Sequence, residues 1–139
     1  MELIQGEAGV RPLGAGYVKK ARQMCDDNNA LLIIDEVQTG IGRTGSWFAF
    51  QREDLAGGVV PDIVTFAKGV TCGYVPLGGV VVSSQIAEYF DDHVLSCGLT
   101  YSGHPLACAA GVACVNYYEE ANIIPHVKEM GKVLSARLE

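Results

Sequence analysis

Short apolar runs alternate along this chain with segments whose apolar residues recur every three or four positions. The short runs occupy residues 30–34, 63–66 and 79–83. They predict β-strands, because they are brief, rich in Val and Ile and bounded by turn-forming residues. The periodic segments occupy residues 16–28, 84–90, a stretch after Pro105, and 124–138. Strands that alternate with helices are typical of a sheet covered by helices, so the pattern indicates an α/β fold.

The first of these runs ends in two acidic residues. Five consecutive apolar residues, 30–34, predict a strand buried on both faces, as in parallel sheets. Asp35 and Glu36 follow it and point to opposite sides if the strand continues, so we expect different roles for them. A carboxylate at the carboxyl end of a parallel strand lies where α/β sheets bind ligands, which makes Asp35 a candidate site residue. The alternative is a helix cap or the partner of a structural arginine.

The second run ends at Lys68, which follows residues 63–67 and precedes Gly69. A partly desolvated lysine is a usable amine nucleophile for carbonyl compounds. The alternative is a lysine whose charged end extends into solvent. Taken with Asp35, the amine has a more specific interpretation. An amine that forms a Schiff base and a carboxylate that holds a protonated pyridine nitrogen are what pyridoxal phosphate chemistry requires of a protein.

Composition narrows the classes of partner. Ten Lys and Arg against sixteen Asp and Glu give the 139-residue chain a net charge of −6, without a basic cluster. Nucleic acid is therefore disfavoured. Residues 105–115, the longest weakly polar stretch, are too few to span a membrane, which takes roughly 18–20 apolar residues. Five cysteines without a C-x-x-C or a zinc-finger spacing predict reduced, buried thiols and no metal site. We therefore expect a cytoplasmic protein, or a mitochondrial matrix protein in a eukaryote.

Three segments in register resemble the class III (ornithine/omega-type) pyridoxal-phosphate-dependent aminotransferases. L-L-I-I-D-E-V-Q-T-G at residues 31–40, followed by G-R-T-G at 42–45, is similar to that family's sequence around its cofactor-binding acid. P-D-I-V-T-F-A-K-G at 61–69 resembles the segment with the cofactor lysine, and T-Y-S-G-H-P at 100–105 resembles the loop beyond it. The resemblance implies an internal fragment of the large domain of a fold-type I enzyme.

The resemblance also implies a role for individual residues. Lys68 corresponds to the lysine that forms the Schiff base and acts as general acid and base, and Asp35 to the acid bound to the pyridine nitrogen. Val37 would pack on the cofactor ring, and Gln38 would hydrogen-bond its phenolic oxygen. Thr100 corresponds to a threonine that reaches the cofactor phosphate of a partner subunit, which implies a homodimer with shared active sites.

Glu7 is similar to a glutamate that in some members gates the substrate pocket by pairing with a downstream arginine.

The implied reaction moves an amino group from an amine or (omega-)amino acid to a 2-oxo acid such as pyruvate or 2-oxoglutarate, by a ping-pong route. The implied fold is a mostly parallel sheet with one antiparallel strand, at 79–83, and helices on both faces. We expect residues 1–139 to form part of the cofactor-binding large domain, with about 120–139 beginning the helix that leads toward a C-terminal domain. We expect the isolated piece to be inactive.

Two other interpretations were weighed. Residues 40–45 read G-x-G-x-x-G, the fingerprint of a dinucleotide-binding Rossmann domain. That motif belongs in the turn directly between a strand and a helix, whereas residues 35–39 intervene here, so this interpretation is disfavoured. The other is a truncated, non-catalytic domain that serves as a dimerisation or assembly module. The presence of Asp35, Gln38 and Lys68 disfavours it, and uptake of pyridoxal phosphate would distinguish the two.

Overall fold

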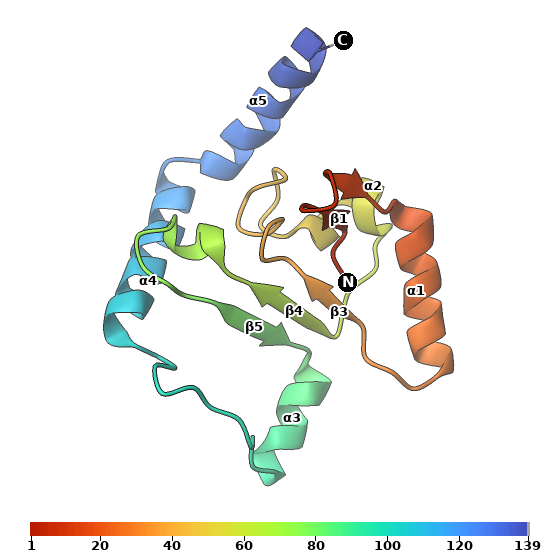
Figure 1. The fold of residues 1–139 in the computed structure, drawn as a ribbon, viewed down its shortest axis with the longest axis vertical. Helices are drawn as coiled ribbons and strands as arrows, with labels where there is room; N and C mark the ends of the chain where they lie inside the picture. Colours follow the sequence, from red (N-terminus) through yellow and green to blue (C-terminus); the bar gives the residue numbers. More distant parts are fainter. Residues whose placement is uncertain (139) are drawn as a thin grey trace.

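The computed structural model of the chain describes residues 1–138 (Figure 1). Its elements in chain order are β1 (Ile4–Gln5), β2 (Arg11–Pro12), α1 (Ala15–Asp27), β3 (Ile33–Asp35), the 3-10 turn η1 (Ala49–Gln51), α2 (Glu53–Ala56), β4 (Ile63–Phe66), the 3-10 turn η2 (Lys68–Thr71), β5 (Gly79–Val82), α3 (Ser84–Asp92), α4 (Pro105–Glu120) and α5 (Ile123–Leu138). The predicted alternation of strands and helices is confirmed, and β4 has the bounds that its apolar run predicts.

The central sheet has mixed strand directions. Within residues 1–138 its order is β3-β4-β5, with β3 parallel and β5 antiparallel to β4. Ile34, Val64 and Val81 stand opposite one another in this register, so they share one face of the sheet. Glu2 forms a parallel bridge with Asp35 at the other edge of β3. The predicted α/β class and the antiparallel position of the third strand are therefore confirmed.

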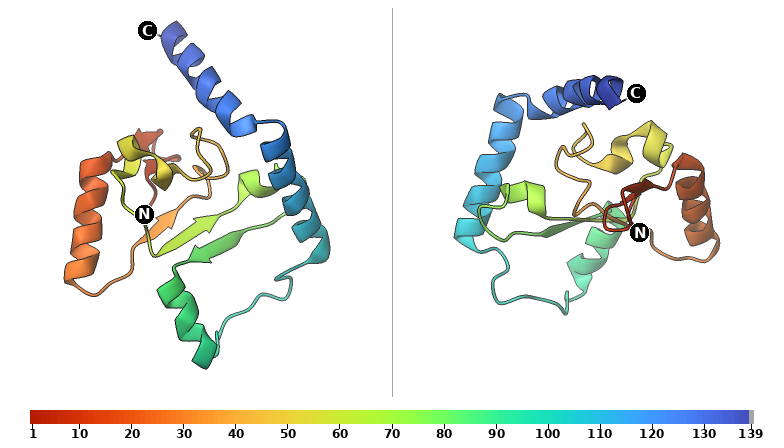
Figure 2. Two further views of the ribbon diagram at one scale, coloured as in Figure 1. Left: turned by 180° about the vertical axis from the view of Figure 1, so that it is seen from behind. Right: turned by 45° about the horizontal axis from the view of Figure 1, so that its top comes forward.

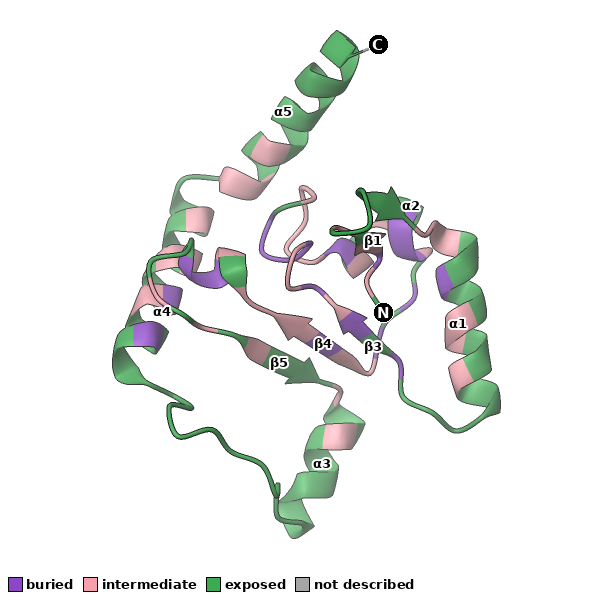
Figure 3. Ribbon diagram, viewed as in Figure 1, coloured by how far each residue is buried: buried purple, intermediate pink, exposed green. Residues whose placement is uncertain are grey.

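The hydrophobic core lies on one face of this sheet. Val18 of α1 and Ile34 of β3 are fully buried there, and α2 contributes Leu55 and Ala56. The buried residues in Figure 3 accordingly gather around β3, α2 and the inner side of α1. Complete burial of a side chain such as Val18 or Ile34 stabilises the fold by about 1.5–3 kcal/mol. This packing fixes the position of β3, and with it the residues that follow its carboxyl end.

The opposite face of the sheet is exposed within residues 1–138. Ile33 is 44% exposed and Val80 and Val82 of β5 are 61% and 39% exposed. The prediction that residues 30–34 form a strand buried on both faces is therefore wrong for this chain. The apolar run at residues 30–34 predicts only that the strand is apolar. Whether its second face is buried depends on a distant element that the run does not reveal. The strand is also shorter, because regular pairing begins at Ile33.

The C-terminal half contains two long helices. Pro105 opens α4, where its missing N–H removes no intrahelical hydrogen bond, and His104 Nδ1 accepts a hydrogen bond from the Leu106 amide. Small residues of α4 pack closely on the rest of the fold: Ala107 and Gly111 are buried, and a Cβ at Gly111 would lie 2.9 Å from Leu77 Cδ2. In contrast, α5 has no buried residue and projects away from the sheet (Figure 2). No helix among residues 1–138 is long and apolar enough to cross a membrane.

Candidate active site

The two residues singled out for chemistry stand at the same edge of the sheet. Asp35 is the last residue of β3, and Lys68 is the first residue of η2, directly after β4. Because β3 and β4 are parallel neighbours, their carboxyl ends coincide, and Asp35 pairs with Thr65, three residues before Lys68. The open edge beyond the carboxyl ends of parallel strands is where α/β sheets bind ligands.

A pocket of ≈ 500 Å³ opens at this edge. Its lining includes three of the predicted site residues, namely Val37, Gln38 and Lys68. Gly6 comes from the turn after β1, and Thr44 comes from the glycine-rich loop at 40–45. The structure thus brings together residues that are 30 or more positions apart in the sequence. Cofactor-sized pockets typically combine an apolar wall with a few convergent polar groups, as this one does.

A larger hollow of ≈ 730 Å³ lies elsewhere, between the loop at 43–46, residues 51–54 and α5. Its lining includes the cations Arg52 and Lys132, and each of them already has an acidic partner, Asp54 and Glu129 respectively. None of the predicted catalytic or cofactor-binding residues lines it. We therefore place the candidate site in the smaller pocket.

The backbone at Lys68 is unusual. Its φ of 45° is in the left-handed region, which non-glycine residues seldom adopt except where the surrounding structure holds them. Such conformations cluster at functional sites, since they aim a side chain that a regular strand would direct elsewhere. The expected partial burial of Lys68 is wrong for this chain: the residue is exposed, because the strand end from which it projects opens into the pocket.

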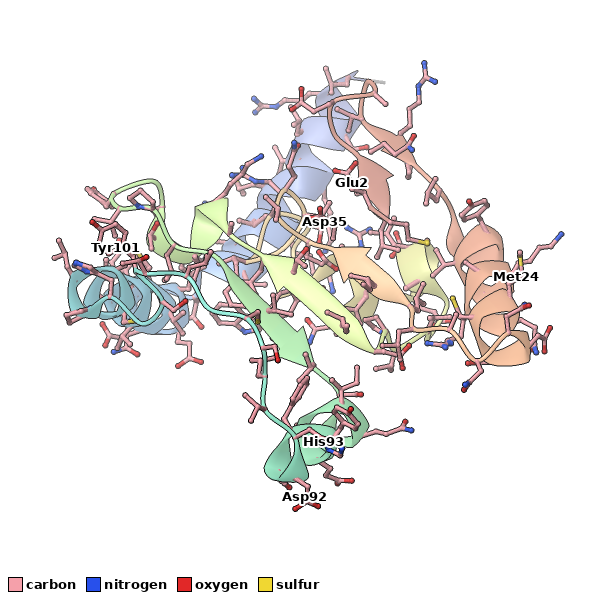
Figure 4. All side chains as sticks on the ribbon, turned by 60° about the horizontal axis from the view of Figure 1, so that its bottom comes forward. Glu2, Met24, Asp35, Asp92, His93 and Tyr101 are labelled. Atoms are coloured by element: carbon pink, nitrogen blue, oxygen red, sulfur yellow. The ribbon has the colours of Figure 1, made fainter. Side chains whose placement is uncertain are left out.

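Asp35 is half-buried and partly satisfied. Its Oδ1 accepts a hydrogen bond of 2.9 Å from the Val37 amide, which folds the chain into the turn that carries Val37 and Gln38. No cation within residues 1–138 forms an ion pair with Asp35. Figure 4 shows Asp35 at the tip of β3, near the centre of the molecule.

Gln38 and Glu7 are joined directly. Gln38 Nε2 donates a hydrogen bond of 3.1 Å to Glu7 Oε1, across the gap between the β1–β2 turn and the turn after β3. Gly6 makes this contact possible, because a Cβ at that position would lie 2.0 Å from Gln38 Oε1. The predicted gate residue thus adjoins the pocket through Gln38.

Thr100 stands apart from this group. It is exposed and lies in the segment between α3 and α4, outside the lining of the pocket. Its neighbour Tyr101 is on the α4 side of the molecule in Figure 4, well away from Asp35. The chain therefore does not bring Thr100 to its own pocket.

This arrangement can be compared with known proteins. The chain matches the family Aminotransferase class-III over residues 1–139. The chain belongs to this family. Class III aminotransferases are pyridoxal phosphate enzymes, so the cofactor predicted from the sequence is confirmed at the level of the family.

Individual class III aminotransferases are closely similar to the chain. An acetylornithine aminotransferase of Bifidobacterium longum is 56% identical over 135 residues, which cover 96% of this chain and 31% of that protein. An acetylornithine aminotransferase of Methanopyrus kandleri is 45% identical, over 96% of this chain and 32% of that protein. The crystal structure of taurine:2-oxoglutarate aminotransferase from Bifidobacterium kashiwanohense, in complex with PLP and glutamate, superposes with a TM-score of 0.90 at 60% identity, covering 98% of this chain and 30% of that one. The chain spans about a third of the length of the relatives it matches.

Glu36, next to Asp35, has a role that the sequence left open. Glu36 is fully buried, and its carboxylate accepts hydrogen bonds from the Thr39 hydroxyl and from the amides of Ala49 and Phe50. It therefore anchors η1 beneath the loop at 40–45, while Asp35 faces the other side of the sheet. The two acids therefore have different surroundings, as expected from their opposite directions along the strand. The burial of Glu36 can be read from the alternation of side chains along a strand. Glu36 is two positions after Ile34, so its side chain points to the same face of the sheet and into the core.

Gly6 and Thr44 were also not singled out from the sequence. Position 6 requires glycine because its backbone lies close to the Gln38 side chain. No local sequence pattern reveals this contact. Thr44 lines the pocket, and its Oγ1 is buried without a hydrogen-bond partner among residues 1–138. Gly40 and Ile41, in the same glycine-rich loop as Thr44, also line the pocket.

Proposed function

We propose that this chain carries the cofactor lysine of an enzyme that transfers an amino group from an amine or omega-amino acid to a 2-oxo acid. The observation that supports this most is the meeting of Val37, Gln38 and Lys68 in one pocket, at the edge of the sheet where Asp35 ends β3. An amine, an amide and an apolar wall come together there, and a carboxylate stands at the neighbouring strand end.

The residues present fit pyridoxal phosphate. Lys68 offers a solvent-accessible primary amine in the pocket, and Asp35 has one carboxylate oxygen engaged by the Val37 amide. When bound, the cofactor supplies an aldehyde that condenses with amines and an electron-withdrawing ring that stabilises a substrate carbanion. Asp35 would accept a hydrogen bond from the ring N–H, Val37 would pack against the ring, and Gln38 would donate to its phenolic oxygen.

Lys68 would have two functions in this scheme. Its Nζ would attach the cofactor covalently and, once substrate has displaced it, would take a proton from the substrate carbon and return it two atoms away, in a 1,3-shift. Because Lys68 begins a tight turn rather than lying in a flexible loop, its amine would stay in the same position during both proton transfers. We expect donor and acceptor to use the site in succession, so that steady-state kinetics of the whole enzyme follow a ping-pong pattern.

The names of the relatives support a class of substrate. Acetylornithine and taurine both carry a primary amine on a short chain that ends in an acidic group, and one similar structure is named for 2-oxoglutarate as acceptor. We propose donors of this class, with 2-oxoglutarate or pyruvate as acceptor. Glu7, at the rim of the pocket on Gln38, would adjust the charge that meets the donor's acidic group.

We also propose a homodimer with shared sites. Thr100 is exposed and outside the pocket of its own chain, which suits a residue that serves the cofactor phosphate of a partner subunit. Residues 1–139 would then be part of the cofactor-binding large domain, with α5 leading toward a C-terminal domain. On this proposal the isolated chain lacks part of the phosphate and substrate contacts, so we expect it to transfer no amino groups by itself.

The proposal is tested by titrating pyridoxal phosphate into the purified chain and fixing any adduct with borohydride. The visible spectrum and a peptide mass map should show one predominant adduct, on Lys68. Lys68→Ala should abolish it. Lys20→Ala, which removes an exposed lysine from α1, is the matched control and should leave it unchanged. Labelling spread evenly over the lysines, or unchanged in Lys68→Ala, would contradict the proposal.

A second candidate function, an assembly module without catalysis, is favoured by the exposed apolar face of the sheet. The same titration separates the two. A pure interaction module shows no Lys68-dependent uptake of the cofactor at any concentration.

A further inference from the structure

The cysteines are less buried than the sequence predicts. Cys72, Cys97 and Cys108 are exposed, and Cys25 and Cys114 are half-buried, so the prediction of buried apolar thiols is wrong for this chain. Two of the five come together in the fold although they are 42 positions apart in the sequence. Cys72 ends η2, the turn that begins with Lys68, and Cys114 lies in the middle of α4.

The contacts of Cys72 define this cluster. Its Sγ lies 3.7 Å from the carbonyl oxygen of Gly69 and 3.8 Å from the hydroxyl oxygen of Tyr118. Cys114 is one helical turn before Tyr118 and three residues after Gly111, which packs against Leu77 and Val70. Residues at this spacing share a helix face, so Cys114 faces η2.

The two thiols are near enough to interact. Burial, and after it the neighbouring Cys72, raises the pKa of the Cys114 thiol. The raised pKa keeps Cys114 protonated at neutral pH. Cys72 is the exposed member of the pair, so it is the one that a solvent-borne oxidant meets first.

We propose that Cys72 and Cys114 form a reversible disulfide, which ties the Lys68 turn to α4. The oxidant would be a low-molecular-weight disulfide. Cys72 thiolate attacks one of its sulfurs, the S–S bond breaks, and one small thiol leaves with a proton. Cys114 then loses its proton and attacks the Cys72 sulfur of the mixed disulfide, which expels the second small thiol. Two protein thiols lose two electrons and two protons, and the small disulfide is reduced to two thiols.

The bond would act on the pocket through η2. This turn has a left-handed residue at each end, Lys68 with φ 45° and Cys72 with φ 51°. Drawing the Cys72 sulfur toward Cys114 removes it from the Gly69 carbonyl and pulls on the turn from the end opposite Lys68. This consequence for Lys68 rests on the proposed function, whereas the disulfide itself does not.

The experiment exposes the full chain to mixtures of oxidised and reduced glutathione, blocks the remaining thiols and maps the peptides without reduction. In the wild type we expect a loss of two free thiols per chain and a cross-linked peptide that joins Cys72 to Cys114. Cys114→Ser should stop at a mixed disulfide of glutathione with Cys72. Excess reduced glutathione should restore both thiols of the wild type.

Cys108→Ser is the matched control, because Cys108 is also on α4 but exposed and at a different phase of the helix. It should form the same cross-link as the wild type. The proposal is overturned if Cys72 of the wild type carries glutathione as stably as in Cys114→Ser, or if the only disulfides join separate chains. Circular dichroism shows whether each variant is folded. If a variant is unfolded, the non-reduced peptide map of the wild type alone shows whether the Cys72–Cys114 disulfide forms.

A second arm measures the effect on the pocket, by labelling Lys68 with pyridoxal phosphate and borohydride in oxidised and reduced chains. Slower labelling after oxidation supports the coupling to Lys68. If the Cys72–Cys114 cross-link forms but the labelling of Lys68 is unchanged, only the coupling to Lys68 is overturned. If Lys68 is labelled in neither state, the proposed function is the part that fails.

Discussion

At the residue scale, the two adjacent acids after β3 show how one strand serves two purposes. Asp35 stays half-buried at the carboxyl end of β3, with a single amide bound to one oxygen. Glu36 is fully buried and satisfies the hydroxyl of Thr39 and two backbone amides. A buried carboxylate is tolerated only when it is hydrogen-bonded in this way, because the desolvation penalty is otherwise large.

Removal of the Glu36 carboxylate should therefore unfold the region behind the pocket. In Glu36→Ala the amides of Ala49 and Phe50 lose their acceptor inside the core, at a cost to the free energy of unfolding of about 3 kcal/mol or more. Glu36→Gln keeps one acceptor oxygen and should lose about 1–2 kcal/mol. Urea denaturation measures both. Glu88→Ala, on the exposed face of α3, is the control and should change stability by no more than about 0.5 kcal/mol. An Ala variant as stable as this control would contradict the assignment.

Gly6 should be needed for the pocket rather than for the fold. Gly6→Ala places a methyl group 2.0 Å from Gln38 Oε1, so the Gln38 side chain must move and its Nε2 gives up the hydrogen bond that it donates to Glu7. We expect pyridoxal phosphate to bind about fivefold to tenfold more weakly, the equivalent of one lost hydrogen bond of about 1 kcal/mol, as measured by absorbance titration. Gly16→Ala has open space around the added methyl group and should bind the cofactor as the wild type does. Equal affinity in both variants would refute the role of Gly6.

The contrast between these residues shows what the sequence can predict. Lys68 and Asp35 are predicted because their types and their positions at strand ends match a chemistry, whereas Gln38 is implied by the family resemblance. β4 is bounded correctly because its run is short and closed by Pro61 and Gly69. The exposure of Lys68 and of one sheet face was not predictable, because burial depends on which distant element covers a side chain. The contact of Gly6 with Gln38 was missed for the same reason.

At the element scale, one ion pair connects α1 to the sheet. Arg22 Nη1 of α1 lies 2.7 Å from Asp62 Oδ2, just before β4, and the same oxygen accepts from the Leu32 amide before β3. Burial alone would raise the pKa of Asp62, but the hydrogen bonds from Arg22 and Leu32 outweigh it and hold that pKa below its ordinary value. Helix and strands are thus locked together by one carboxylate.

This lowered pKa fixes the direction of a pH effect. The ionised carboxylate stabilises the folded state above its ordinary pKa of about 3.9, and this contribution is lost as the pH falls through the lower folded-state pKa. We expect Asp62→Asn to cost about 1–3 kcal/mol near neutral pH and to differ less from the wild type as the pH falls below about 4. Urea denaturation between pH 7 and about pH 3 tests this. A constant difference across that range would show that the charge of Asp62 does not contribute.

At the scale of the whole molecule, apolar surface is distributed unevenly. One face of the sheet packs on α1 and α2, while the other exposes Ile33, Val80 and Val82 within residues 1–138. An apolar β-edge without charged side chains is a site at which chains associate. β5 has such an edge, since it pairs with β4 alone in the sheet.

The isolated chain should therefore self-associate through this face. We expect it to bind a hydrophobic dye and to sediment as species heavier than the 14.8 kDa chain at micromolar concentration. The double variant Val80→Lys, Val82→Lys should bind less dye and shift toward monomer. Val60→Lys replaces a valine that is equally exposed but lies in a loop, and should leave association unchanged. Equal effects of the loop and strand variants would show that added charge, rather than the sheet face, controls association.

The parallel pairing of β3 with β4 has a consequence for how such sites diversify. Asp35 ends β3 opposite Thr65 of β4, at the spacing of two adjacent strands, about 4.8 Å, and Lys68 follows Thr65 by three residues. The sheet therefore sets the positions from which both groups extend, so changes in the loops farther along the chain can alter what enters the pocket while the strand ends stay in place. We therefore expect that grafting the loops of a relative onto this chain would change the substrate preference without moving the strand ends that carry Asp35 and Lys68.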